Sequence, residues 1–165
     1  MPFLRFKRTE AEFPPVISAG PELLKEGPFF ARWYITYRLE EETERARRYG
    51  RPLALAVALA PRQFVVEQRR ADVLAAATEA AQASARSTDL LGWLDGESFL
   101  MIMPETTPAD AEAAVVRWRN EMWLRSRRLG GQKWSIAVLP SPVEFESAEQ
   151  FTQSIPQMLE QREAA

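Results

Sequence analysis

Hydrophobic and polar residues along this chain follow patterns with the lengths of single helices and strands. Apolar residues at helical spacing predict a helix over 30–49, which ends at Gly50. The run PLALAVALAP, residues 52–61, is apolar throughout between its prolines, which indicates a central strand buried on both faces. Residues 64–85 are rich in alanine and carry a narrow apolar stripe, so they predict a second helix.

Two short apolar segments, 89–94 and 98–103, predict a β-hairpin. Between them, Asp95-Gly96 suits a primed two-residue turn. Asp95 and Glu97 also form a candidate site for one divalent cation, although such sites usually need more oxygen ligands. Ordinary turn chemistry is the alternative explanation of these two acids.

The last third of the chain predicts a helix, a strand and a further helix. Thr107 is a good N-cap for a helix that ends at Gly130, and residues 133–140 read as a strand. Pro156 lies inside the final helical pattern, so we expect that helix to be kinked or split. Trp118 shares a helix face with other apolar residues and is expected in the core, whereas Trp123 lies off that face.

The resulting order, α-β-α-β-β-α-β-α, predicts an α+β fold with one mixed sheet and helices on its faces. We expect an irregular N-terminal arm over residues 1–27 and a single domain over 28–165. No apolar run reaches the ~20 residues that span a bilayer, and no signal peptide is recognisable, so a cytoplasmic protein is expected.

Composition removes several classes of chemistry. The 165 residues include no cysteine and no histidine, which excludes disulfides, thiolate and imidazole metal ligands, and triads that need a histidine base. The formal net charge of −2 offers no general field for nucleic acid, and nucleic-acid binding is not expected. Catalysis would have to rest on carboxylates, lysine or arginine, with a metal bound through oxygen.

Three stretches together resemble the GGDEF domain, the bacterial diguanylate cyclase fold that makes the second messenger cyclic di-GMP. They are RLEEETERARRYGRPLALAVAL (38–59), RSTDLLGWLDGESFLMIMPET (86–106) and GGQKWSIAVLP (130–140). The resemblance covers roughly residues 24–160, and it implies a central mixed sheet flanked by helices.

The departures from that family concern its metal ligands. The signature Gly-Gly-Asp/Glu-Glu-Phe corresponds here to Asp95, Gly96, Glu97, Ser98 and Phe99. Glu97 keeps one carboxylate, Ser98 stands in place of a metal-binding Glu, and Ala60 stands in place of the metal-binding Asp of the first strand. Asp95 adds bulk and charge where a nucleotide would lie. Because magnesium-assisted phosphoryl transfer needs such oxygen ligands, we expect no cyclase activity and no resident metal.

Arg86 and Asp89 match the Arg-x-x-Asp inhibitory site of the family, which binds cyclic di-GMP. Arginine can contact phosphate or guanine acceptors, and aspartate can accept hydrogen bonds from the guanine edge. The alternative is a solvated helix end, where these residue types are common. A second arginine often found before the signature is replaced by Trp93. Family members often pair when cyclic di-GMP joins two such sites, so a homodimer is one expectation.

Two functions therefore remain open. The first is a catalytically inactive receptor for cyclic di-GMP that regulates a protein partner. The second is a ligand-free interaction or scaffold module that uses the cyclase fold to present a surface. Trp123 and Trp93 are the candidate partner contacts, because aromatic side chains often anchor interfaces; for Trp93, packing is the alternative.

Overall fold

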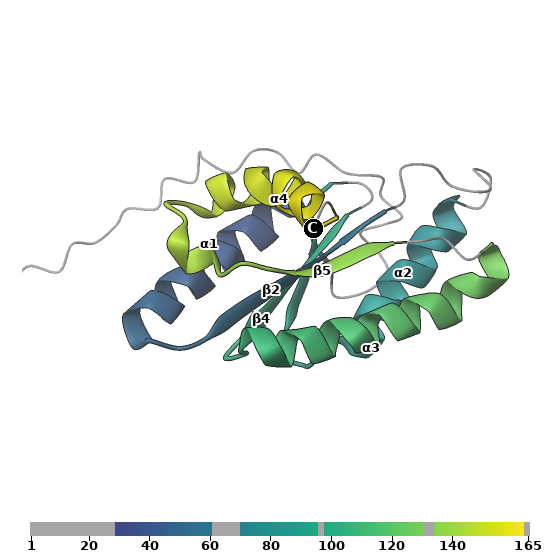
Figure 1. Cartoon of the computed structure of the whole chain (residues 1–165), viewed down its shortest axis with the longest axis horizontal. Helices are drawn as coiled ribbons and strands as arrows, with labels where there is room; N and C mark the ends of the chain where they lie inside the picture. The colour runs from purple at the N-terminus through teal and green to yellow at the C-terminus, as the bar shows by residue number, and fades with distance from the viewer. Residues whose placement is uncertain (1–28, 61–69, 96–97, 131–133, 164–165) are drawn as a thin grey trace, which may run out of the picture.

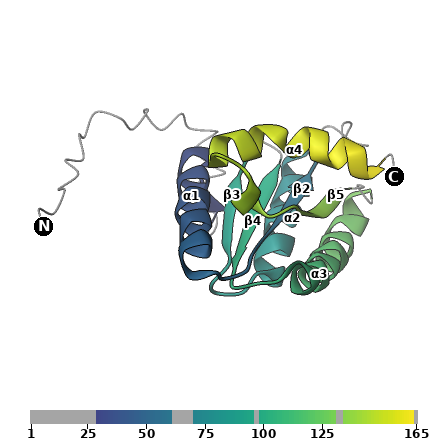
Figure 2. The same ribbon diagram turned by 60° about the vertical axis from the view of Figure 1, so that its left-hand side comes forward.

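The computed structural model describes residues 29–60, 70–95, 98–130 and 134–163. A five-stranded mixed sheet lies between two layers of helices, with α1 and α4 on one face and α2 and α3 on the other (Figures 1 and 2). The predicted arm over 1–27 lies outside the described residues. No helix among the described residues is both long enough and apolar enough to cross a membrane.

The elements follow the order expected from the sequence, with one additional strand at the start. The helices are α1 (Arg32–Tyr49), α2 (Arg70–Ser84), α3 (Pro108–Ser126) and α4 (Ala148–Glu163), with short 3-10 turns η2 (Arg127–Leu129) and η3 (Pro142–Glu144). The strands are β1 (Phe29–Phe30), β2 (Leu53–Leu59), β3 (Leu90–Trp93), β4 (Phe99–Pro104) and β5 (Ser135–Leu139).

Strand β2 occupies the interior of the sheet, whose spatial order is β1-β3-β4-β2-β5. It pairs antiparallel with β4 on one side and with β5 on the other. Its side chains alternate in size: alanines point toward α2 and α3, and Leu53, Leu55 and Val57 point toward α1 and α4. This confirms the prediction of a central strand buried on both faces.

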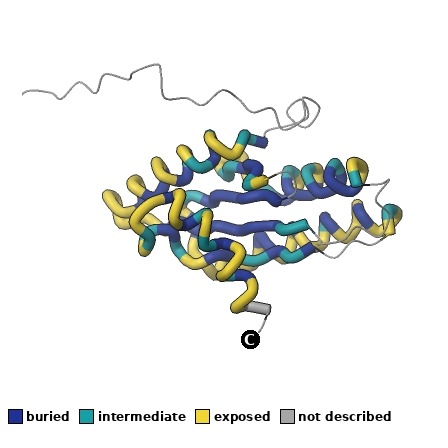
Figure 3. Tube along the Cα trace, turned by 90° about the horizontal axis from the view of Figure 1, so that it is seen from above, coloured by how far each residue is buried: buried dark blue, intermediate teal, exposed yellow. Residues whose placement is uncertain are grey.

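Two hydrophobic clusters form the core, one on each face of the sheet. Trp118 of α3 and Phe99 of β4 are fully buried in the cluster beneath α2 and α3. Ile35 of α1 and Phe151 of α4 are fully buried in the other cluster. The strands are buried along most of their length while the helices keep exposed outer faces (Figure 3). Burial of Trp118 confirms its predicted core position.

Helix boundaries follow local capping chemistry. The Thr107 hydroxyl accepts a hydrogen bond from the backbone N–H of Asp110, so α3 begins where its N-cap predicts. Gly50 adopts a left-handed conformation, with φ of 61°, and ends α1. Gly130, also left-handed, ends η2 after the main helix has stopped at Ser126.

Three expectations about local structure were wrong. Phe30 belongs to strand β1, which pairs in parallel with β3, rather than to the first helix. Of the two alternatives for the final helix, the split is wrong, because α4 continues through Pro156 to Glu163. The hairpin turn is longer than two residues, since the Leu94 N–H donates to the Ser98 carbonyl at 2.8 Å and leaves residues 95–97 between them.

Candidate functional site

The hairpin and the end of β2 meet at one end of the sheet. In the antiparallel ladder Ala58 is opposite Phe99, so Ala60 extends beyond it toward the hairpin. This is the arrangement implied by the resemblance, in which a first-strand carboxylate and the signature share one site. Ala60 is half-buried against the core and carries no oxygen ligand.

Asp95 uses its side chain to stabilise the hairpin turn. Its Oδ1 accepts a hydrogen bond from the backbone N–H of Ser98 at 2.7 Å. Ser98 itself is buried, with 7% of its surface exposed. This hydrogen bond is the ordinary turn chemistry that was the alternative explanation for Asp95. Gly96 and Glu97 lie outside the described residues.

The described residues near the hairpin carry few side-chain oxygens. Across the described ranges, no three acidic side chains gather closely enough to hold a metal ion. Ala60 offers no side-chain oxygen, and Ser98 offers a buried neutral hydroxyl in place of a carboxylate.

Trp93 is part of the core. It is 7% exposed, and its ring lies 4.4 Å from that of Phe99 and 5.7 Å from that of Phe29, measured between centroids. Phe99 in turn stacks on Trp134. The expectation of Trp93 as a partner contact is therefore corrected: its side chain is enclosed by aromatic neighbours, as in the packing alternative.

Arg86 and Asp89 form a closed turn between α2 and β3. The backbone N–H of Arg86 donates to Asp89 Oδ2 at 2.7 Å, and the N–H of Asp89 donates to the Arg86 carbonyl at 3.1 Å. The Arg86 side chain is exposed, whereas Asp89 is half-buried. The turn thus holds a carboxylate at a defined position and leaves a guanidinium at the surface.

The second oxygen of the Asp89 carboxylate is enclosed without a hydrogen-bond partner among the described residues. Burial raises the pKa of Asp89 above its ordinary value, and three interactions oppose this rise: the Arg86 N–H, the Arg86 charge and the charge of Arg117. The turn therefore presents the Asp89 carboxylate with one oxygen that accepts no hydrogen bond, and the charges of Arg86 and Arg117 act on that carboxylate.

Arg117 was not predicted from the sequence. It lies on the exposed surface of α3, which packs against α2 (Figure 1), and its charge is the weakest of the three influences that lower the pKa of Asp89. A single sequence carries no signal for this, because the contact depends on helix packing across residues distant in the chain. Arginines on a helix surface are, taken alone, more simply interpreted as solvated charges.

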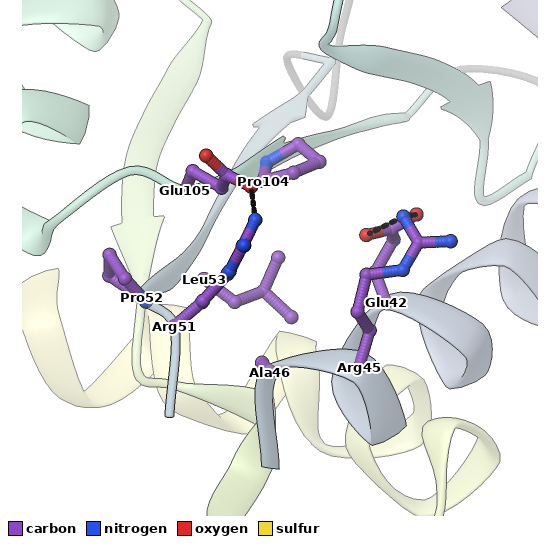
Figure 4. A pocket seen from close by; sticks show the side chains of 8 residues that line it. All are labelled: Glu42, Arg45, Ala46, Arg51, Pro52, Leu53, Pro104 and Glu105. Carbon is purple, nitrogen blue, oxygen red and sulfur yellow. Dashed lines mark hydrogen bonds and ion pairs between the residues drawn. The ribbon is translucent and has the colours of Figure 1, made fainter. Parts of the chain in front are cut away.

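A small pocket at the opposite end of the sheet has its charges paired internally (Figure 4). Arg51 contacts the Glu105 carboxylate, and Arg45 donates to the buried Glu42 at 3.0 Å. Glu105 adopts a left-handed φ of 53°. Since each carboxylate already faces a guanidinium, this pocket offers little to a charged ligand.

Trp123 is exposed, as the sequence predicts, with 59% of its surface accessible. The Arg127 guanidinium lies over its ring, 5.5 Å from the centroid. The side chain is therefore available for contact on the outer surface of α3, and it remains a candidate partner residue.

Comparison with solved structures identifies the fold. A diguanylate cyclase protein from Thermotoga maritima has a TM-score of 0.65 and 18% identity, covering 79% of this chain and 95% of the other. The GGDEF domain of DgcB from Caulobacter crescentus, solved in complex with c-di-GMP, has a TM-score of 0.67, 18% identity and coverages of 84% and 86%.

A third structure is diguanylate cyclase SiaD from Pseudomonas aeruginosa in complex with its activator SiaC. Its TM-score is 0.69 and its identity is 24%. The match covers 82% of this chain and 55% of the SiaD chain. No family model matches the sequence, and no curated protein matches it significantly. The chain has the GGDEF fold, as the sequence resemblance predicts.

Proposed function

We propose that this GGDEF-fold chain is a catalytically inactive signalling domain that binds cyclic di-GMP through Arg86, Asp89 and Arg117. The observation that carries the proposal is the Asp89 carboxylate, which has one hydrogen-bonded oxygen and one enclosed oxygen without a partner among the described residues, near two arginines. Such an arrangement suits a ligand that brings hydrogen-bond donors and negative charge together.

Cyclic di-GMP has both properties. The Watson–Crick edge of guanine carries N–H donors that suit a carboxylate acceptor, and the turn must open for guanine to reach the enclosed Asp89 oxygen. The phosphates carry negative charge, which the guanidinium groups of Arg86 and Arg117 can bind through paired N–H donors. A donated hydrogen bond to Asp89 would satisfy the enclosed oxygen and offset the cost of burying it.

The absence of catalysis is proposed from the residues at the hairpin end of the sheet. Ala60 cannot bind a metal, and Ser98 is a poor substitute for a carboxylate. Asp95 accepts the Ser98 N–H and places a negative charge where the resemblance would put a triphosphate. Glu97 alone cannot hold two ions between two nucleotides.

The related structures support a binding role. DgcB was solved in complex with c-di-GMP, and SiaD was solved in complex with its activator SiaC. Both a nucleotide ligand and a protein partner are therefore compatible with this fold. We infer that a receptor of this kind transmits binding to a partner, either another protein or a second copy of the chain.

The test is calorimetric titration of cyclic di-GMP into the wild type and into Arg86→Ala. Binding by the wild type and its loss in the variant are expected. Arg48→Ala provides the matched control, because Arg48 is an exposed arginine on α1 at the other face of the sheet. Absence of binding heat with the wild type, or equal binding by Arg86→Ala, would contradict the proposal.

A second assay tests the loss of catalysis separately. Purified protein incubated with GTP and either Mg²⁺ or Mn²⁺ is expected to form no cyclic di-GMP, as judged by chromatography. A known diguanylate cyclase in the same buffer serves as the positive control. Formation of the product above the no-protein blank would overturn this part of the proposal.

The exposed Trp123 favours one alternative, a ligand-free interaction module. A large aromatic side chain, 59% exposed and stacked by Arg127, is a typical interface anchor. In that alternative the protein binds no cyclic di-GMP at Arg86 and Asp89. The calorimetric experiment therefore separates the two functions.

A further inference from the structure

The outward face of α3 combines apolar side chains with positive charge. We propose that this face is a docking surface for an acidic amphipathic segment of a partner protein. It is made by exposed positions of one helix, namely Ala109, Ala113, Val116, Asn120, Trp123 and Leu124. Glu112, one turn before Val116, is the exposed acid that borders this face. The proposal does not depend on nucleotide binding at Arg86 and Asp89.

The large apolar side chains of the surface lie in the C-terminal half of the helix. Val116 and Trp123 lie two turns apart on the same side, and they are 50% and 59% exposed. Leu124, next to Trp123, is 49% exposed. Single exposed apolar residues are ordinary, but three large ones on one helical face, with Asn120 between them and Ala113 and Ala109 preceding Val116, form a contact surface.

A hollow beside Leu124 provides a place for an inserted side chain. It lies between α2 and α3, which run side by side on one face of the sheet (Figure 1). Ala75 and Ala76 of α2 line it together with Leu124. Small side chains on α2 thus leave space that an aliphatic side chain of a partner can fill.

The C-terminal half of α3 and η2 carry more basic than acidic side chains, although the whole chain carries −2 and Glu112, Asp72 and Glu79 lie beside them. From Val116 to Leu129 the sequence holds five arginines and one acid: Arg117, Arg119, Arg125, Arg127, Arg128 and Glu121. The Arg119 guanidinium donates to the Ile136 carbonyl of β5, so it belongs to the sheet side of α3. Glu121 pairs with Arg125 at 3.2 Å. Arg127 is positioned over Trp123, so a cation and an aromatic anchor act together. A partner that complements this surface must be acidic.

The neighbouring charges favour a protein over an anionic membrane. Asp72 and Glu79 of α2 line the same hollow as Leu124. A bilayer would press its phosphates against these carboxylates as well as against the arginines. A folded or helical segment can instead place acids opposite Arg127 and an aliphatic side chain in the hollow, in the manner of helix recognition by grooves.

Peptide selection tests the proposal directly, because it enriches the peptides that bind the protein without assuming their sequence. A random library of peptides about four helical turns long is selected against the native chain, and the enriched peptides are assayed by fluorescence anisotropy against variants. Trp123→Ala and Arg127→Glu remove the anchor and the cation. Tyr49→Ala is the matched control, because Tyr49 is an exposed aromatic residue at the end of α1.

We expect enriched peptides to combine aliphatic and acidic residues, and to lose about tenfold or more in affinity for Trp123→Ala and for Arg127→Glu. Tyr49→Ala should bind them like the wild type. Failure to enrich peptides, enrichment of basic peptides, or equal binding by Trp123→Ala overturns the proposal. So does Trp123-dependent sedimentation with vesicles of phosphatidylcholine and phosphatidylglycerol, which would indicate a membrane surface instead.

Discussion

The backbone N–H of Arg86 donates to the Asp89 carboxylate at 2.7 Å, while the other oxygen of that carboxylate remains enclosed without a partner among the described residues. One carboxylate oxygen therefore stabilises the turn through a hydrogen bond. Burial of the other oxygen without a hydrogen bond lowers the stability of the folded protein. Binding sites often keep such an unfavourable group because the ligand completes it.

This relationship predicts how Asp89 affects stability with pH. Burial raises the folded-state pKa of Asp89, so the folded protein holds its proton more tightly than the unfolded chain. Its contribution to stability is then most favourable below the unfolded-state pKa of about 3.9 and is lost as pH rises through the higher folded-state pKa.

Asp89→Asn should remove that loss, because a neutral amide oxygen can still accept the Arg86 N–H. The melting temperature of the variant relative to the wild type is expected to rise between about pH 3.9 and neutrality. Thermal melts across this range provide the measurement. A constant difference at all pH values would show that Asp89 has the same pKa in both states.

Arg117→Ala is expected to weaken cyclic di-GMP binding by about tenfold or more, because it removes one of the two cations near Asp89. Calorimetry provides the dissociation constants, with Arg48→Ala as the control for removing an exposed arginine. Higher salt should reduce the difference between Arg117→Ala and the wild type. An unchanged affinity would place Arg117 outside the site.

Gly92→Ala is expected to destabilise the protein by about 1–3 kcal/mol, because α1 packs directly onto β3 at this point. A Cβ at Gly92 would lie 2.4 Å from the Ile35 Cβ, which is buried and cannot move without shifting the helix. Urea denaturation measures the change in the free energy of unfolding.

Gly50→Ala is the companion variant for this experiment. Its Cβ would meet no atom within 4 Å, so only the left-handed backbone, with φ of 61°, opposes the substitution. The expected cost is about 1 kcal/mol. Equal stability of Gly92→Ala and the wild type would show that α1 is not held against β3 as described.

Two tryptophans of α3 should respond differently to truncation. Trp118 is fully buried on the inner face of α3, and Trp118→Ala is expected to lower the free energy of unfolding by about 3–5 kcal/mol. Trp123→Ala removes an exposed ring and its contact with Arg127, at a cost of about 1 kcal/mol or less. Chemical denaturation of both variants tests this, and comparable losses would contradict the assigned positions.

Much of the fold was predictable because it depends on local patterns. The unbroken apolar run of β2 predicted a central strand, and Thr107 and Gly50 marked helix boundaries. β1 was missed because two residues carry no periodicity and their pairing with β3 is a long-range contact. The sequence left open whether Pro156 would split α4, and the helix is continuous because tertiary packing of its apolar face offsets the lost hydrogen bond.

The candidate site was predictable in part. The spacing of Arg86 and Asp89 identified the turn, but not its reciprocal hydrogen bonds or the enclosed Asp89 oxygen. Trp93 could have been exposed or buried, and only its aromatic neighbours Phe29 and Phe99 settle the matter. Arg117 had no local signal at all.

The sequence by itself determined which chemical groups this protein contains and most of the helices and strands it forms. It contains no histidine or cysteine, and it carries Ala60 and Ser98 where the resemblance implies metal ligands. The tertiary structure decided which of these groups meet. It brought the end of β2 to the hairpin, the charge of Arg117 to Asp89, and the alanines of α2 to Leu124. The physical reason is that local periodicity and capping act within a few residues, whereas a site depends on packing between elements far apart in the chain.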